Sequence, residues 1–133
     1  MYRRETKYGS GTLLDANYII MRVAYLTLDE VNENLATLMA DECGATLFPL
    51  GPRDPKPDGE FDAVLYDLDS LPPPHRKELL SELLSSRPLR PVGVHSYQLE
   101  EDEQAALRRR GLLVCRHIDT AVFQALCSPN GHA

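Results

Sequence analysis

The sequence lacks any run of about 18 apolar residues, the length that a membrane-spanning helix needs. Its first residues include bases but no apolar core of a secretory signal peptide. The three cysteines, Cys43, Cys115 and Cys127, lie far apart and form neither a CxxC pair nor a zinc-binding spacing. These absences argue against membrane insertion, secretion and a metal centre, so we expect a soluble, cytoplasmic protein without a membrane partner.

Positive charge is also scarce, since the formal net charge is −6 at pH 7. Nucleic acids bind to basic patches that neutralise their phosphates, so we expect no nucleic-acid partner. One basic run, Arg108, Arg109 and Arg110, follows four acids at residues 100–103. Acids at the start of a helix and bases at its end complement the helix dipole, so this pattern predicts a helix over residues 100–110.

A chain of 133 residues fits one domain. We expect an N-terminal extension or leader over residues 1–20, the folded domain over 21–128 and a short tail over 129–133. Five short apolar runs within the domain have the length of strands and alternate with amphipathic segments. The expected strands cover residues 21–26, 45–50, 61–68, 91–97 and 112–115.

The segments between these strands predict helices. The first follows a capping-box pattern formed by Thr27 and Glu30. Its apolar positions share one helical face that we expect to be buried: Val31, Leu35, Leu38 and Met39. A further helix follows the prolines at 72–74, and the last one begins at Asp119 or Thr120.

The segment 51–59 holds three prolines and two glycines, which cannot form a regular helix, so we expect a loop there. Alternating apolar strands and helices predict an α/β fold with a doubly wound parallel sheet covered on both faces. In such folds the functional site lies at the carboxyl ends of the strands. Four expected strand ends carry polar side chains: Thr27, Asp67 with Asp69, Ser96, and Arg116 or His117.

Two of these strands resemble those of response-regulator receiver domains, the CheY-like family. Residues 62–67 (DAVLYD) look like the third receiver strand, in which an Asp five residues after another Asp is the phosphoacceptor. Residues 91–96 (PVGVHS) are similar to the fourth strand, which ends in the hydroxyl residue that contacts the phosphoryl group. The resemblance covers roughly residues 21–127 and implies a flavodoxin-like, five-stranded sheet of order 2-1-3-4-5. By this likeness Asp67 occupies the phosphoacceptor position, and the second helix is missing or replaced by the proline-rich loop.

The sequence departs from the receiver pattern at two positions. Receivers end their first strand with two acids that hold Mg²⁺, and here Thr27 and Leu28 stand in those places. Receivers also carry a lysine after the fifth strand, where this chain has Arg116, whose planar guanidinium is not equivalent to an ammonium group. Asp67 with Asp69 is a thin ligand set for Mg²⁺, which prefers several oxygen ligands.

We therefore expect a degenerate pseudo-receiver that is no enzyme, has no cofactor and retains Asp67 only as a vestige. A first alternative is an atypical phosphoacceptor that uses Asp67 in a two-component phosphorelay and binds Mg²⁺. A second alternative is a fragment of a haloacid-dehalogenase-type phosphatase, because residues 64–69 (VLYDLD) resemble the DxD strand of those enzymes. Their later lysine and acidic-pair motifs have no match in residues 97–133, which disfavours that alternative.

Receivers generally communicate through a face made by their fourth helix, fifth strand and fifth helix, which corresponds here to residues 100–126. Acids such as Glu101 at one end of the expected helix and Arg108, Arg109 and Arg110 at the other make it self-complementary in an antiparallel pair. We therefore expect a protein partner, either a kinase, an output domain or a second copy. Weak, salt-sensitive homodimerisation is one form of this expectation.

Overall fold

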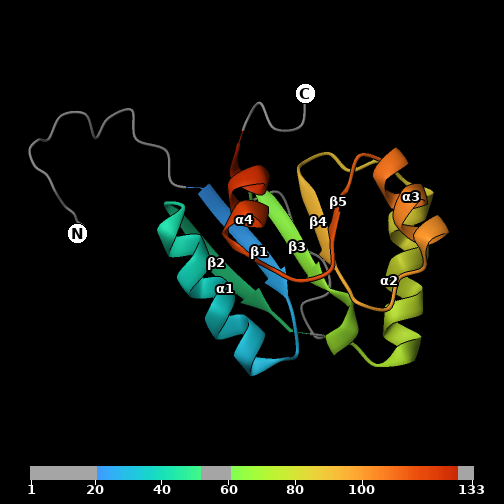
Figure 1. Ribbon diagram of the computed structural model, residues 1–133, viewed down its shortest axis with the longest axis horizontal. Coiled ribbons are helices and arrows are strands. Elements are labelled where there is room, and N and C mark those ends of the chain that lie inside the picture. The colour runs from blue at the N-terminus through green and yellow to red at the C-terminus, as the bar shows by residue number, and fades with distance from the viewer. Residues whose placement is uncertain (1–20, 52–60, 129–133) are drawn as a thin grey trace, which may run out of the picture.

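The computed structural model describes residues 21–51 and 61–128 (Figure 1). Five parallel strands form one sheet in the order β2-β1-β3-β4-β5, which confirms the predicted α/β, doubly wound fold class. The expected N-terminal extension, C-terminal tail and most of the proline-rich loop lie outside the described residues. The strands are β1 (Met21–Leu26), β2 (Ala45–Leu50), β3 (Ala63–Asp67), β4 (Val92–His95) and β5 (Leu113–Cys115).

Four α-helices cover the sheet within the described residues: α1 (Glu30–Glu42), α2 (Pro73–Ser85), α3 (Glu101–Arg109) and α4 (Thr120–Cys127). Figure 1 shows α1 and α4 on one face and α2 and α3 on the other. Alternate residues of β1 point to opposite faces of the sheet. Val23 and Tyr25 pack in one core cluster, and Ala24 and Leu26 pack in the other. This two-sided burial explains why the strands are continuous apolar runs. No described helix has the length and apolar character that a membrane span requires.

The first helix begins differently from the prediction. Asp29, not Thr27, is the N-cap, and its carboxylate accepts a hydrogen bond of 3.0 Å from the backbone N–H of Asn32. The predicted capping box of Thr27 and Glu30 is wrong, since the Thr27 hydroxyl accepts from the backbone N–H of Asp29 at 3.0 Å and donates to Asp67 at 2.8 Å. A strand-end hydroxyl therefore binds within the sheet, and the acid two residues later caps the helix.

The buried face of α1 was also predicted wrongly. Ala36 and Ala40 are fully buried against the sheet, whereas Val31, Leu35 and Leu38 are exposed. Of the predicted face, only Met39 packs against the core, and it is half-buried. Two alanines, one helical turn apart, leave no long side chain between helix and sheet, so the backbone of α1 can approach the strands closely.

The remaining elements agree with the sequence patterns within one or two residues at their ends. Asp119 is the N-cap of α4 and accepts from the backbone N–H of Val122 at 3.0 Å. This helix buries Val122, Phe123 and Leu126, as its spacing predicts. The prolines occupy the start of α2, where the missing N–H groups cost no helical hydrogen bond.

Replacing Gly93 of β4 by alanine should destabilise the fold. A Cβ atom there would lie 3.0 Å from Leu65 Cδ1 and 3.3 Å from Leu126 Cδ2, so both leucines would have to move. We expect the free energy of unfolding in a urea titration to fall by about 1–3 kcal/mol. Gly51→Ala is the matched control, because a Cβ at Gly51 meets nothing within 4 Å. Equal stabilities of the two variants would show that the core at β4 is looser than the structure implies.

Candidate functional site

The carboxyl ends of β1, β3 and β4 meet at one edge of the sheet. Leu26 of β1 lies beside Tyr66 of β3, and Asp67 of β3 lies beside His95 of β4 in the strand register. Because neighbouring parallel strands end at the same edge, the residues that follow them are brought together. Thr27, Asp67 and Ser96 are all buried there.

Asp67 is enclosed at this edge, with only 1% of its surface exposed. Its Oδ2 atom accepts hydrogen bonds from Thr27 Oγ1 at 2.8 Å and from Asn32 Nδ2 of α1 at 3.0 Å. Its Oδ1 atom faces His95, whose Nε2 lies 3.8 Å away. A buried carboxylate is tolerated only when hydrogen-bond donors replace water, and Thr27 and Asn32 are those donors.

His95 and Tyr25 form the other side of this enclosure. The Tyr25 hydroxyl and His95 Nε2 are 2.7 Å apart and share one hydrogen bond, whichever tautomer the ring adopts. Burial lowers the pKa of His95, and Asp67 and Asp69 oppose that shift only in part. Burial, reinforced by the charge of Asp67, raises the pKa of Tyr25. Both groups are therefore neutral near pH 7 and contribute no charge beside Asp67.

Asp69 and Ser96 form a second, separate pair. Ser96 Oγ donates to Asp69 Oδ1 at 2.5 Å, and the backbone N–H of Tyr97 donates to Asp69 Oδ2 at 2.7 Å. The Ser96 oxygen also accepts from the backbone N–H of Gln98 at 3.0 Å. The Ser96 hydroxyl proton is thus directed to Asp69 and not to Asp67.

Arg116 and His117 lie at the surface of the same edge. Arg116 is exposed and makes no hydrogen bond or ion pair within the part of the chain that the structure describes. His117 is exposed and its ring stacks on that of Tyr97, with centroids 6.2 Å apart. His95 is the histidine that faces the Asp67 carboxylate, with its Nε2 3.8 Å from Asp67 Oδ1.

Sequence reasoning missed Asn32, Tyr25 and His95 as partners of the site. A signal for His95 was available, because it immediately precedes Ser96 in an apolar strand whose neighbour ends at Asp67. Tyr25 and Asn32 gave no comparable signal. Tyr25 looks like an ordinary apolar strand residue, and Asn32 reaches Asp67 only because of how α1 is seated on the sheet.

The edge does not fit Mg²⁺. Thr27 and Leu28 provide no carboxylate, and the Asp29 carboxylate caps α1. Over residues 21–51 and 61–128, no three His, Cys, Asp or Glu side chains gather in a way that could hold a metal ion. Mg²⁺ prefers an octahedron of oxygens that includes carboxylates, and here Asp67 already accepts two hydrogen bonds on one oxygen.

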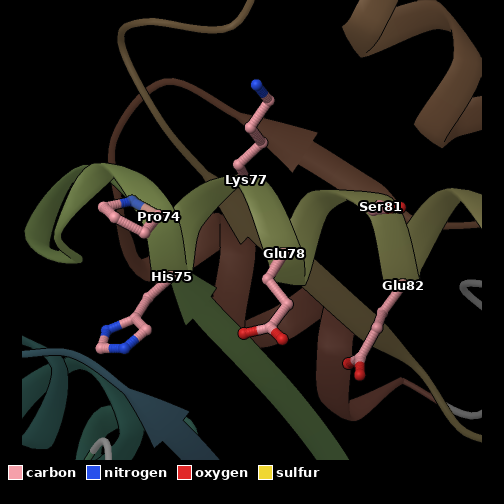
Figure 2. A pocket seen from close by; sticks show the side chains of 6 residues that line it. All are labelled: Pro74, His75, Lys77, Glu78, Ser81 and Glu82. Carbon is pink, nitrogen blue, oxygen red and sulfur yellow. The ribbon is translucent and has the colours of Figure 1, made fainter.

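A shallow hollow along α2 does not offer a site either (Figure 2). All of its lining residues belong to that one helix, so it has no opposing wall among them. Figure 2 shows the His75, Glu78 and Glu82 side chains on one side of the helix and Lys77 on the other. The lining residues are Pro74, His75, Lys77, Glu78, Ser81 and Glu82.

Comparison with known proteins gives matches in structure and not in sequence. No family model matches the chain, and no curated protein matches its sequence. A bacteriophytochrome response regulator superposes with a TM-score of 0.56 at 16% identity, over 81% of this chain and 76% of that one. The chain has the receiver fold. A CheY-like response regulator from Mesorhizobium loti has the same identity and a TM-score of 0.50, over 78% of this chain and 92% of its own. At this identity the likeness to receivers establishes the fold alone.

Acid should weaken this receiver fold through His95. Burial lowers the pKa of His95 in the folded chain. As the pH falls below about 6.5, the His95 imidazole therefore becomes protonated in the unfolded chain while it stays neutral in the folded chain. The free energy of unfolding should therefore be unaffected by His95 above that pH and decrease as the pH falls below it. We expect His95→Gln to flatten this decrease in urea titrations between pH 7 and pH 5.

The matched control is His75→Gln, because His75 is exposed on α2. It should leave the pH dependence of the wild-type protein unchanged. A wild-type stability that rises on acidification would contradict the assignment of a neutral, buried imidazole at His95.

Proposed function

We propose that the protein is a receiver-like signalling domain that acts by contacting other proteins and is not phosphorylated in the Mg²⁺-dependent way. The observation that carries this proposal is the enclosure of Asp67, which is 1% exposed and has two donors on Oδ2. The receiver fold supports the signalling part of the proposal, and the polar edge supports the loss of phosphoryl chemistry.

Phosphoryl transfer to Asp67 would require two things that this edge does not favour. The attacking carboxylate oxygen must reach the phosphorus atom in line with the leaving oxygen, which needs an accessible Asp67. Negative charge on the transferred group must also be neutralised, usually by a metal ion and a cation. Thr27 and Leu28 supply no carboxylate to hold a metal ion, and within the described residues Arg116 makes no ion pair with Asp67.

Hydrolysis of the haloacid-dehalogenase type is supported no better. Asp67 would be its nucleophile and is buried, while Asp69 would be its general acid. Both oxygens of Asp69 accept hydrogen bonds, from Ser96 and from the backbone of Tyr97. Both Asp69 oxygens are therefore already engaged by groups of the protein itself. We therefore propose a role without catalysis.

In this proposal Asp67 is a structural residue. It connects β3 to the end of β1 through Thr27 and to α1 through Asn32. We expect Thr27→Val to lower the free energy of unfolding by about 1–3 kcal/mol, because the buried Asp67 oxygen then loses a donor while the side-chain volume is kept. Thr37→Val is the matched control, since the Thr37 hydroxyl bonds only its own helix at an exposed position. Equal urea midpoints for the two variants would remove the structural role.

The proposal is tested most directly by adding beryllofluoride, a phosphoryl mimic, together with millimolar Mg²⁺. We expect no saturable change in the backbone amide signals of residues near Asp67, because the edge lacks the first-strand acids that would hold the metal. Incubation with acetyl phosphate should likewise leave the intact mass unchanged. A saturable shift that Asp67→Asn abolishes would instead establish the atypical phosphoacceptor.

We also propose that the exposed surface of α3 is the docking surface for a kinase or an output domain. Glu101 and Asp102 are exposed at its start, and Arg108 and Arg109 are exposed at its end. Arg108 also donates to the backbone carbonyl of Val114 at 3.1 Å, so part of its role is to hold α3 against β5. Arg110 is half-buried, which leaves Arg109 as the base most available to a partner.

A further inference from the structure

The side of α3 that faces away from the sheet is centred on Ala105. The helix buries Leu107, which packs in the core beneath it. Ala105 lies two positions before Leu107, about 200° around the helix, so it points away from that core. Arg110 is the half-buried C-cap residue and lies outside this outward side. The exposed charged residues of the helix surround Ala105: Glu101, Asp102, Arg108 and Arg109.

These four charges form two flanks of the same order, one on each side of Ala105. Glu101 is followed seven residues later by Arg108. Asp102 is followed at the same interval by Arg109. Because seven residues complete about two turns of a helix, each acid lies on the same flank as the arginine that follows it. Both flanks therefore begin with an acid and end with a base, and all of their members lie within the helix.

Neither flank pairs its charges within its own helix. Seven residues separate acid and base by about 10 Å along the helix axis, which is too far for an ion pair. The helical positions three and four residues from each charge, where an intrahelical partner would lie, are uncharged: Gln104, Ala105 and Ala106. Among the described residues, Glu101 and Arg109 make no hydrogen bond or ion pair.

Asp102 and Arg108 are only partly engaged by the backbone. Asp102 Oδ1 accepts from the backbone N–H of Glu103 at 2.9 Å. One terminal nitrogen of Arg108 donates to the carbonyl of Val114 at 3.1 Å. Asp102 Oδ2 and the other N–H groups of Arg108 face no opposite charge within the described part of the chain. The outward side of α3 thus presents ordered charges whose partners are not in the same molecule.

We propose that α3 packs antiparallel against α3 of a second copy of the chain, about a two-fold axis at Ala105. The rotation reverses the order of the charges along the helix and keeps each flank on its own side of the contact. Glu101 therefore faces the partner's Arg108. By the same symmetry, Asp102 faces the partner's Arg109. The small side chain of Ala105 meets its own copy at the centre and leaves room for the two helices to approach.

This inference rests on the proposed function for the role of the α3 surface and names a second copy of the chain as its partner. The charges that carry it are exposed in the unmodified chain, so the contact does not require a change at Asp67. A kinase or an output domain that binds the same surface would compete with the second copy. Self-association through α3 would thus regulate access to the docking surface.

The expected dimer is weak. Exposed ion pairs contribute little each, and a contact between two single helices falls below about 1,200 Å², where transient complexes are found. We expect a dissociation constant of about 0.1–1 mM. The net charge of −6 on each copy opposes association over long distances. Salt at about 0.1 M, with a Debye length of about 10 Å, screens that long-range repulsion more than it screens ion pairs in contact.

An exchange of charges, followed by sedimentation equilibrium of the full chain at about 0.1 M salt, tests this proposal. Asp102→Arg and Arg109→Asp, each alone, should weaken dimerisation about tenfold or more, because like charges then face each other at both symmetry-related pairs. An equimolar mixture of the two variants should dimerise again. In the mixed dimer, position 102 of each chain faces an opposite charge at position 109 of the other.

The matched control is Arg87→Asp, which changes the net charge by the same amount at an exposed position outside α3. It should dimerise like the wild-type chain. The far-ultraviolet circular dichroism of all variants should equal that of the wild type, because the substituted side chains are exposed. Recovery in the mixture also shows that both variants are folded.

Three outcomes would overturn the proposal. One is a wild-type chain that stays monomeric at millimolar concentration. Another is a dimer that both single variants retain, which would place the interface outside α3. The third is a mixture that stays monomeric although each variant alone has lost dimerisation. Failure of the proposed function is a separate observation, since it appears as a beryllofluoride response that Asp67→Asn abolishes, whatever the state of association.

Discussion

The hydrogen bonds to the buried carboxylate of Asp67 constrain more of this structure than any other interaction. A carboxylate that is 1% exposed needs donors from the protein, and two of them come from different elements: Thr27 at the end of β1 and Asn32 in α1. The Thr27 oxygen accepts from the backbone N–H of Asp29, and the Asp29 carboxylate caps the helix. One acid at the end of β3 thus contacts both the strand end that precedes α1 and the first turn of α1.

The hydrogen bond from Asn32 of α1 to Asp67 determines which of the two apolar faces of the helix is buried. Residues 32, 36 and 40 recur every four positions and therefore share one side of a helix. When Asn32 turns toward Asp67, Ala36 and Ala40 turn toward the sheet, where both are fully buried. Leu35 and Leu38 are rotated toward solvent by the same geometry. The exposure of Leu35 and Leu38 is thus a consequence of the polar contact at Asp67.

This link also explains what the sequence could and could not predict. The strand runs and the last two helices follow from local patterns, because apolar strands and capped helices carry their signals within a few residues. The sheet order was implied by the resemblance to receivers and not by any local pattern. The buried face of α1 does not follow from a local pattern. Its row of large apolar residues gives a stronger periodic signal than Ala36 and Ala40, and the contact between Asn32 and Asp67, 35 positions apart, determines which face is buried. The partnership of Tyr25, His95 and Asp67 is likewise a matter of strand register, which no local pattern records.

The proposed loss of phosphoryl chemistry is compatible with a receiver architecture at this edge of the sheet. An acid at the end of β1 would repel Asp67 unless a cation lay between them, whereas the hydroxyl of Thr27 donates to Asp67 directly. This hydrogen bond itself requires no cation between Thr27 and Asp67. Tyr25 and His95, two neutral groups that bind one another, fill the space beside Asp67 Oδ1 without adding charge. On the proposed function, phosphorylation of the enclosed carboxylate provides no route to alter the surface, and signalling depends on faces that are always present, such as that of α3.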